Sequence, residues 1–280
     1  NDLVGSDMTI GADTALSRIV SAMDMLASTA ASHQRTFIVE VMGRRCGYLP
    51  LMSAVAGGAD YVFTPEQPAG PNWREEMCAK LALGREAGRR ESMILVAEGA
   101  RDTEGNSVTS EDVAAAVRDG LGEDARSTIL GHVQRGGSPS AYDRWMSTSL
   151  GYTATQEIFD PDNHGEALIL GVRHNRIASL PMVEAIKDTR AVVDLIKQGD
   201  YEAARRARGD SYYEMGEIFR ILSDPPQTRD HSDRPRRVAI LHAGGLAPGM
   251  NTAARAAVRM GLHRGWTVLG IENSWAGLQD

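Results

Sequence analysis

The chain has 280 residues, of which 42% are hydrophobic and 24% are charged, a composition typical of one or two globular domains. Its formal net charge of −7 argues against a general nucleic-acid binder, and no apolar run approaches the roughly 18 residues of a membrane-spanning helix. The two cysteines, Cys46 and Cys78, indicate a cytoplasmic protein with reduced thiols. Neither cysteine has the partner spacing of a metal site, and we assign no metal ligand.

Hydrophobic periodicity predicts that helices and strands alternate along the first part of the chain. The expected helices cover residues 10–31, 48–56, 72–89, a stretch that begins at 110, and 140–159. The expected strands cover residues 36–42, 61–64, 92–96, 127–130 and 167–172. Such alternation with short connections predicts an α/β fold, with Rossmann-like parallel sheets and flanking helices.

The remainder of the chain changes character twice. Residues 181–222 have a charged, helical pattern, and residues 223–236 include three prolines and predict a linker. A strand at 237–242, a glycine-rich turn, a helix at 250–264 and a strand at 267–271 then predict a new βαβ unit. We therefore expect one domain over residues 1–222 and the start of a second over 237–280. Because the chain begins at Asn1 and stops just after a strand, we expect an internal piece of a longer protein.

Polar residues and glycines follow three of the expected strands. Met42-Gly43-Arg44 follows the first, Glu98-Gly99 follows another, and residues 131–137 (GHVQRGG) follow a third. Ligands of parallel α/β sheets bind beyond the carboxyl ends of the strands. An arginine fork matches phosphate oxygens, glycine lets the backbone approach a ligand, and a carboxylate can accept hydrogen bonds from sugar hydroxyls. A single arginine at a strand edge is usually solvated, but the recurrence favours a sugar-phosphate site.

Longer motifs then resemble the ATP-dependent 6-phosphofructokinase family. They are residues 32–35 (SHQR), 39–44 (VEVMGR), 131–139 (GHVQRGGSP) and 142–144 (YDR), and residues 244–251 (GGLAPGMN) resemble the family's N-terminal nucleotide loop. In a single-unit enzyme that loop precedes the sugar-phosphate motifs, whereas here it follows them. The resemblance therefore implies a phosphofructokinase-like fold in the tandem, eukaryotic-type form with two fused units. A circular permutation would give the same order.

The resemblance implies transfer of the ATP γ-phosphoryl group to fructose 6-phosphate in glycolysis, with Mg²⁺ accompanying ATP. It assigns the sugar phosphate to Met42, Gly43, Arg44, Glu98, His132 and Arg135, with Arg44 also near the transferred phosphoryl group. Arg35 and Arg126, which precede two of the strands, would reach into a neighbouring unit's site, and this implies a homo-oligomer, either a tetramer or a dimer of tandem units. The family's general base would immediately precede Asn1, so we expect the isolated chain to lack kinase activity.

The second unit's loop departs from the family's catalytic pattern. Gly244, Gly245, Gly249 and Asn251 are expected to form its nucleotide or effector loop, because glycines at a strand–helix junction leave backbone amides open to phosphate. Leu246 stands where catalytic loops of the family usually carry Asp, which favours a regulatory half. Two alternatives stay open: a pyrophosphate-dependent phosphofructokinase and a regulatory, non-catalytic half.

Overall fold

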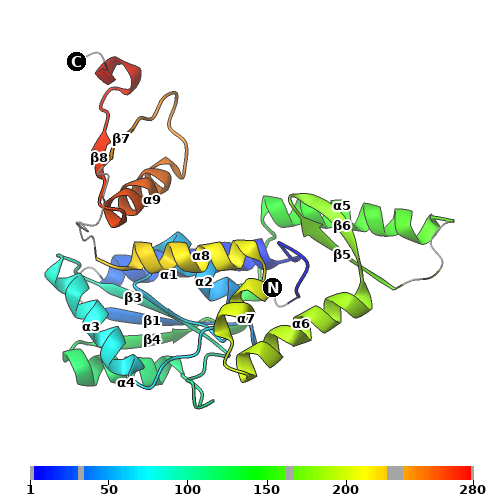
Figure 1. Ribbon diagram of the computed structural model, residues 1–280, viewed down its shortest axis with the longest axis horizontal. Coiled ribbons are helices and arrows are strands. Elements are labelled where there is room, and N and C mark those ends of the chain that lie inside the picture. Colours follow the sequence, from blue (N-terminus) through cyan, green and yellow to red (C-terminus); the bar gives the residue numbers. More distant parts are fainter. Residues whose placement is uncertain (1–2, 31–34, 162–164, 166, 226–235, 279–280) are drawn as a thin grey trace. The chain divides into compact units, whose positions relative to one another are not determined.

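The computed structural model describes residues 3–30, 35–161, 165, 167–225 and 236–278 (Figure 1). The chain separates into two compact units, residues 1–217 and 218–280. Helix α8 (Asp210–Ser223) crosses that boundary. Residues 226–235, most of the expected linker, lie outside the described residues, and the division expected at residues 222 and 237 stays a prediction.

A four-stranded parallel sheet in the order β2-β3-β1-β4 forms the centre of the first unit. Its strands are β1 (Thr36–Val41), β2 (Tyr61–Phe63), β3 (Ser92–Ala97) and β4 (Ala125–Ile129). The inner strands β1 and β3 are almost continuously apolar, as is typical of strands covered on both faces. The predicted parallel α/β fold is therefore confirmed.

Four helices cover the two faces of this sheet (Figure 1): α1 (Ala12–Ala30), α2 (Tyr48–Gly57), α3 (Trp73–Glu86) and α4 (Ser110–Leu121). Successive strand residues point to opposite faces. Ile38, Ile94 and Val96 belong to one buried cluster with residues of α3 and α4, whereas α1 and α2 pack on the other side of β1 and β3. None of the described helices combines the length and the apolar character needed to cross a membrane.

The rest of the first unit lies outside the parallel sheet and contains a strand that was not predicted. It comprises α5 (Ala141–Phe159), β5 (Leu168–Arg173), β6 (Arg176–Pro181), α6 (Met182–Lys197), α7 (Tyr201–Ala207) and most of α8. Strand β6 was not predicted; it pairs antiparallel with β5 through a tight turn at His174 and Asn175, both with positive φ. Such turns are usually marked by Asn-Gly, so the sequence signal was weak. Strand β4 begins at Ala125, two residues earlier than expected, and thus contains Arg126.

The second unit contains the expected βαβ arrangement. Strands β7 (Arg237–Ile240) and β8 (Thr267–Gly270) pair in parallel, and α9 (Met250–His263) connects them in sequence. A short 3-10 helix, η2 (Ser274–Leu278), follows β8. The glycine-rich residues 244–249 therefore lie between a strand and the start of a helix, as predicted.

Candidate functional site

The loop at residues 42–47, which joins β1 to α2, is held by side chains from distant parts of the chain. The side-chain amide of Gln134 forms two hydrogen bonds with the backbone of Met42. Its Oε1 atom accepts from the Met42 N–H at 2.8 Å, and its Nε2 atom donates to the Met42 carbonyl at 3.4 Å. Gln134 is only 2% exposed. A buried amide with both ends satisfied fixes the position of its partner, because breaking either bond leaves a buried polar group without a partner.

Glu98 anchors the next two residues of the same loop. Its Oε2 accepts hydrogen bonds from the backbone N–H of Gly43 at 3.2 Å and of Arg44 at 3.0 Å. The N–H of Arg44, followed by that of Gly43, lowers the pKa of this carboxyl group below its ordinary value. Glu98 therefore fixes the loop through one oxygen, while its other oxygen, Oε1, accepts no hydrogen bond from the part of the chain that the structure describes.

Arg44 occupies a strained backbone conformation within this loop. Its φ of 51° lies in the left-handed region, which costs a residue with a side chain about 1–2 kcal/mol. Two net hydrogen bonds of about 1 kcal/mol each are enough to offset such a cost, and the loop has more than two. Gly99 makes the close approach possible, since a Cβ there would lie 2.0 Å from the Arg44 carbonyl oxygen.

The segment after β4 brings two further side chains with nitrogen donors to the same edge of the sheet. The 3-10 helix η1 (Gly131–Arg135) begins directly beyond the strand, and the Leu130 N–H donates to the Glu40 carbonyl of β1 at 3.2 Å. His132 and Arg135 are exposed on it. Neither Arg44 nor Arg135 forms a side-chain hydrogen bond or ion pair with a described residue. Both guanidinium groups are thus available to an anion.

Helices α1 and α5 begin next to this segment and are joined there by Asp143. The Asp143 carboxylate, 3% exposed, accepts from the backbone N–H of Gly11 at 2.9 Å and of Thr14 at 2.8 Å, and also from the Thr14 hydroxyl. In return, the Ser140 hydroxyl at the start of α5 donates to Asp13 of α1 at 2.5 Å. The Thr14 hydroxyl also accepts from the Ser140 N–H at 2.9 Å, so side-chain hydrogen bonds link the two helix starts.

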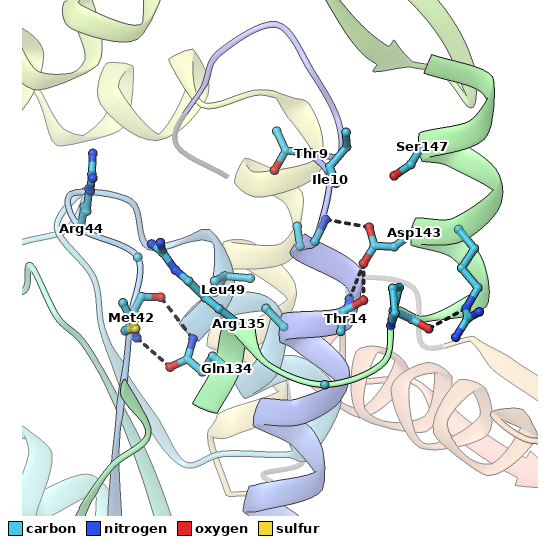
Figure 2. Close-up of a pocket in the computed structure, with 17 residues that line it drawn as sticks. Thr9, Ile10, Thr14, Met42, Arg44, Leu49, Gln134, Arg135, Asp143 and Ser147 are labelled. Carbon is cyan, nitrogen blue, oxygen red and sulfur yellow. Dashed lines mark hydrogen bonds between the residues drawn. The ribbon is translucent and has the colours of Figure 1, made fainter. Parts of the chain in front are cut away.

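These elements enclose a cavity of about 560 Å³ (Figure 2). It is lined by the start of α1, the loop after β1, the segment after β4 and the first turns of α5, with Met42, Arg44, Arg135 and Ser147 among its residues. Two helix N-termini, which carry partial positive charge, and the arginines make it suitable for a small anion. Among the described lining residues Asp143 alone is acidic, and both its oxygens already accept hydrogen bonds.

The predicted sugar-phosphate residues fall into two groups. Met42, Gly43, Arg44 and Arg135 line the cavity, and Glu98 and His132 lie beside it, on the loops that follow β3 and β4.

Arg35 and Arg126, in contrast, lie at the opposite edge of the sheet, because Arg35 precedes β1 and Arg126 is near the start of β4. Both bind Asp124, at 2.8 Å and 3.0 Å, and these arginines hold the pKa of the exposed Asp124 carboxyl below its usual range.

Two structural residues of the site were missed by the sequence analysis. Gln134 and Asp143 both lie inside motifs that resemble the family, GHVQRGG and YDR, yet neither was assigned a role. A polar residue within a specific motif is the signal that could have found them. What the sequence did not show is that both side chains are buried and bind backbone groups of the protein.

The loop of the second unit has a different construction. Gly244 and Gly249 have φ of 88° and 97°, which only glycine adopts readily, whereas Gly245 has no positive φ. Gly249 caps α9, and Asn251 is exposed in its first turn. Within the described ranges, no cluster of three or more His, Cys, Asp or Glu side chains could hold a metal ion.

Comparisons with known proteins identify the family of the chain. The family model described as phosphofructokinase matches residues 1–158 and 237–280. The ATP-dependent 6-phosphofructokinase 1 of Caenorhabditis elegans is 42% identical over 283 residues, covering 100% of this chain and 35% of that protein. An ATP-dependent 6-phosphofructokinase of Aspergillus fumigatus is 43% identical over 281 residues, covering 99% of this chain and 35% of that protein.

A solved structure gives the same result. The phosphofructokinase of Saccharomyces cerevisiae superimposes with a TM-score of 0.94 at 36% sequence identity, and the match covers 99% of this chain and 37% of that one. The chain thus spans 35% of the length of the curated relatives described above.

Proposed function

Since the chain belongs to the phosphofructokinase family, we propose that it forms part of an ATP-dependent 6-phosphofructokinase of tandem type, which transfers the ATP γ-phosphoryl group to fructose 6-phosphate. The cavity beside residues 42–44 is the proposed sugar-phosphate site. The observation that carries this proposal is the anchored 42–47 loop, which places Arg44 at the cavity that Arg135 also lines, with neither guanidinium in an ion pair with a described residue. Relatives named for ATP, at 42% and 43% identity, favour ATP over pyrophosphate.

The side chains of this site bind and position charge rather than form covalent bonds. Arg135 and His132 donate hydrogen bonds to the phosphate ester of the sugar, and Arg44 neutralises charge on the phosphoryl group as it is transferred. The Glu98 Oε1 atom accepts a hydrogen bond from a sugar hydroxyl, which orients the ring. Positioning of this kind can supply a large part of the barrier reduction, since misplacement by about 1 Å costs roughly 100-fold in rate.

Proton transfer requires a group beyond these residues. Asp143, whose carboxylate is the one found in the described part of the cavity lining, is occupied by hydrogen bonds from Gly11 and α1, so we assign it no role as general base. The described residues also offer no acidic cluster for Mg²⁺, which would accompany ATP, and none of the steps above depends on the ion.

Arg35 and Arg126 fit a role in a second copy of the site. They lie at the edge of the sheet opposite the cavity, and the Arg126 side chain is 61% exposed. Asp124 keeps them together as a cationic pair. In this proposal they complete the sugar-phosphate site of a neighbouring unit, so the cytoplasmic enzyme works as a homo-oligomer.

The parent enzyme that carries this chain provides the test. Purified parent is supplied with fructose 6-phosphate and either ATP or pyrophosphate, and fructose 1,6-bisphosphate is measured. We expect product with ATP, and none from the isolated 280-residue chain with either donor. Product with pyrophosphate alone, or no product with either donor, would contradict the proposal.

A further inference from the structure

A buried ion pair binds the end of the 42–47 loop and is not part of the described cavity lining. Glu66, in the turn after β2, and Arg208, at the end of α7, bind each other at 2.7 Å, and their side chains are 0% and 5% exposed. The partners are separated by 142 residues. Tyr212 of α8 also donates its hydroxyl to Glu66 at 3.0 Å.

Both members of this pair also hold the backbone of the loop. The two carboxylate oxygens of Glu66 accept from the Gly47 N–H at 3.1 and 2.9 Å. The guanidinium of Arg208 uses Nε for Glu66 and Nη2 for the Arg45 carbonyl, each at 2.7 Å. One arginine fork thus joins the ion pair to the residue directly after Arg44.

The surroundings leave this end of the loop little freedom. A Cβ on Gly47 would lie 2.6 Å from both Glu66 Oε2 and Thr64 Cβ. Cys46 is completely buried, and burial, reinforced by the Glu66 carboxylate, raises the pKa of its thiol to about 12. The thiol therefore stays neutral and adds no charge beside the pair.

A contribution to stability does not by itself explain why this ion pair is present, because apolar residues of similar volume often replace a buried ion pair without loss of stability. The contacts of the pair with the loop backbone offer a better explanation. Gln134 and Glu98 fix residues 42–44 from one side, and Glu66 and Arg208 fix residues 45–47 from the other. Arg44 lies between the two sets of anchors.

We propose that Glu66 and Arg208 are positioning residues, which hold Arg44 in place for phosphoryl transfer through the backbone of residues 45–47. This inference rests on the proposed function, because it takes Arg44 as a contact of the reacting phosphoryl group. It extends the site to Arg208, the residue that caps the C-terminal end of α7 and is not among the described residues that line the cavity.

The test compares Arg208→Lys with Arg205→Lys in the parent enzyme. Lysine keeps the charge, but a single ammonium group cannot reproduce the arginine fork that serves Glu66 and the Arg45 carbonyl together. Arg205 is a matched control, because it lies on the same helix and binds Glu202 and Glu217 instead of the loop. The measured quantities are kcat, KM for fructose 6-phosphate and KM for ATP.

For Arg208→Lys we expect kcat/KM for fructose 6-phosphate to fall by about 10-fold or more, with KM for ATP within twofold of wild type. Arg205→Lys should stay within about twofold on every measure. Equal values for the two variants would overturn the inference. A wild-type parent without fructose 6-phosphate kinase activity would instead overturn the proposed function.

Glu66→Gln keeps the test decisive if Arg208→Lys does not fold. The amide retains one oxygen for the Gly47 N–H but loses the charge and the second acceptor. The same selective loss toward fructose 6-phosphate would support the inference. Kinetics equal to those of Arg205→Lys would overturn it.

Discussion

Two strand–loop–helix junctions of this chain are built in opposite ways. In the β1–α2 junction, side chains from distant segments bind the backbone of residues 42–47: Gln134, Glu98, Glu66 and Arg208. The β7–α9 junction lacks such anchors among the described residues 236–278. The hydrogen bonds of residues 242–249 join them to the start of α9, for example from the Met250 N–H to the Ala247 carbonyl at 3.2 Å. Leu246 is fully exposed in that second loop.

Under the proposed function, the two loops would bind phosphate in different ways. In the first loop, backbone N–H groups donate to side chains of the protein, and in our proposal the ligand is bound by the side chain of Arg44. The second loop has glycines with positive φ and leaves backbone N–H groups near a helix start, which is how backbone cradles bind phosphate. We therefore expect the first loop to have its final shape before the sugar arrives, and the second to depend on its ligand.

The strongest challenge to the anchored loop is Gly99→Ala. The new Cβ would meet the Arg44 carbonyl oxygen at 2.0 Å, and this contact is with backbone, so the loop itself must move. We expect kcat/KM for fructose 6-phosphate of the parent enzyme to fall by roughly 100-fold, with KM for ATP little changed. Gly151→Ala is the control, since its Cβ meets nothing within 4 Å in α5. Similar kinetics for the two variants would show that the loop tolerates displacement.

Gln134→Glu should have the next largest effect. A carboxylate accepts but cannot donate, so the Met42 carbonyl loses its partner and a charge is placed in a buried position. We expect a loss of about 1–3 kcal/mol in the free energy of unfolding and a raised KM for fructose 6-phosphate. Denaturant titration and steady-state kinetics measure the two effects. Exposed Gln156→Glu should change neither, and an equal effect there would contradict the role of Gln134.

The anchor at Glu98 predicts a dependence on pH. Hydrogen bonds from Arg44 and Gly43 lower its pKa, so its stabilising effect is complete above the ordinary value of 4.5 and is lost as the pH falls through the lowered folded value. The amide proton resonances of Gly43 and Arg44 should therefore shift in this acidic range, below pH 4.5. In Glu98→Gln the transition should disappear. A transition that persists in that variant would assign it to another group.

The second loop should respond to substitution only locally. Gly249→Ala forces φ of 97° on a residue with a side chain and should cost about 1–2 kcal/mol, whereas Gly245→Ala has open space and no positive φ. Thermal unfolding of the chain should separate the two variants. Kinetics of the parent enzyme toward fructose 6-phosphate should change less than about twofold in both. A large effect of Gly249→Ala on sugar kinetics would contradict the separation of the two loops.

The sequence predicted the neighbourhood of the site because of one geometrical rule. Residues that follow parallel strands gather at one edge, so Met42, Glu98 and Arg135 could be placed together before any coordinates. The same rule separates Arg126 from them, because Arg126 lies near the start of a strand. Strand β4 begins two residues earlier than its hydrophobic pattern indicated, so Arg126 lies within the strand rather than before it. Strand β6 was missed because its turn is His-Asn.

The sequence did not show which side chains bind the backbone of the 42–47 loop. Glu66 and Arg208 are 142 residues apart, and no periodicity connects a turn after a strand with the end of a distant helix. Gln134 lies between His132 and Arg135, which are exposed, while its own side chain is buried in a 3-10 turn. Which of several adjacent polar residues faces inward depends on tertiary packing rather than on residue type.

Amide hydrogen exchange of the unliganded chain tests the difference between the two loops most directly. The N–H groups of Met42, Gly43, Arg44 and Gly47 should be protected, because each donates to an internal side chain. Those of Gly244 and Gly245 should exchange close to the rates of an unstructured chain. Equal and rapid exchange in both loops would show that the sugar-phosphate loop is not shaped in advance.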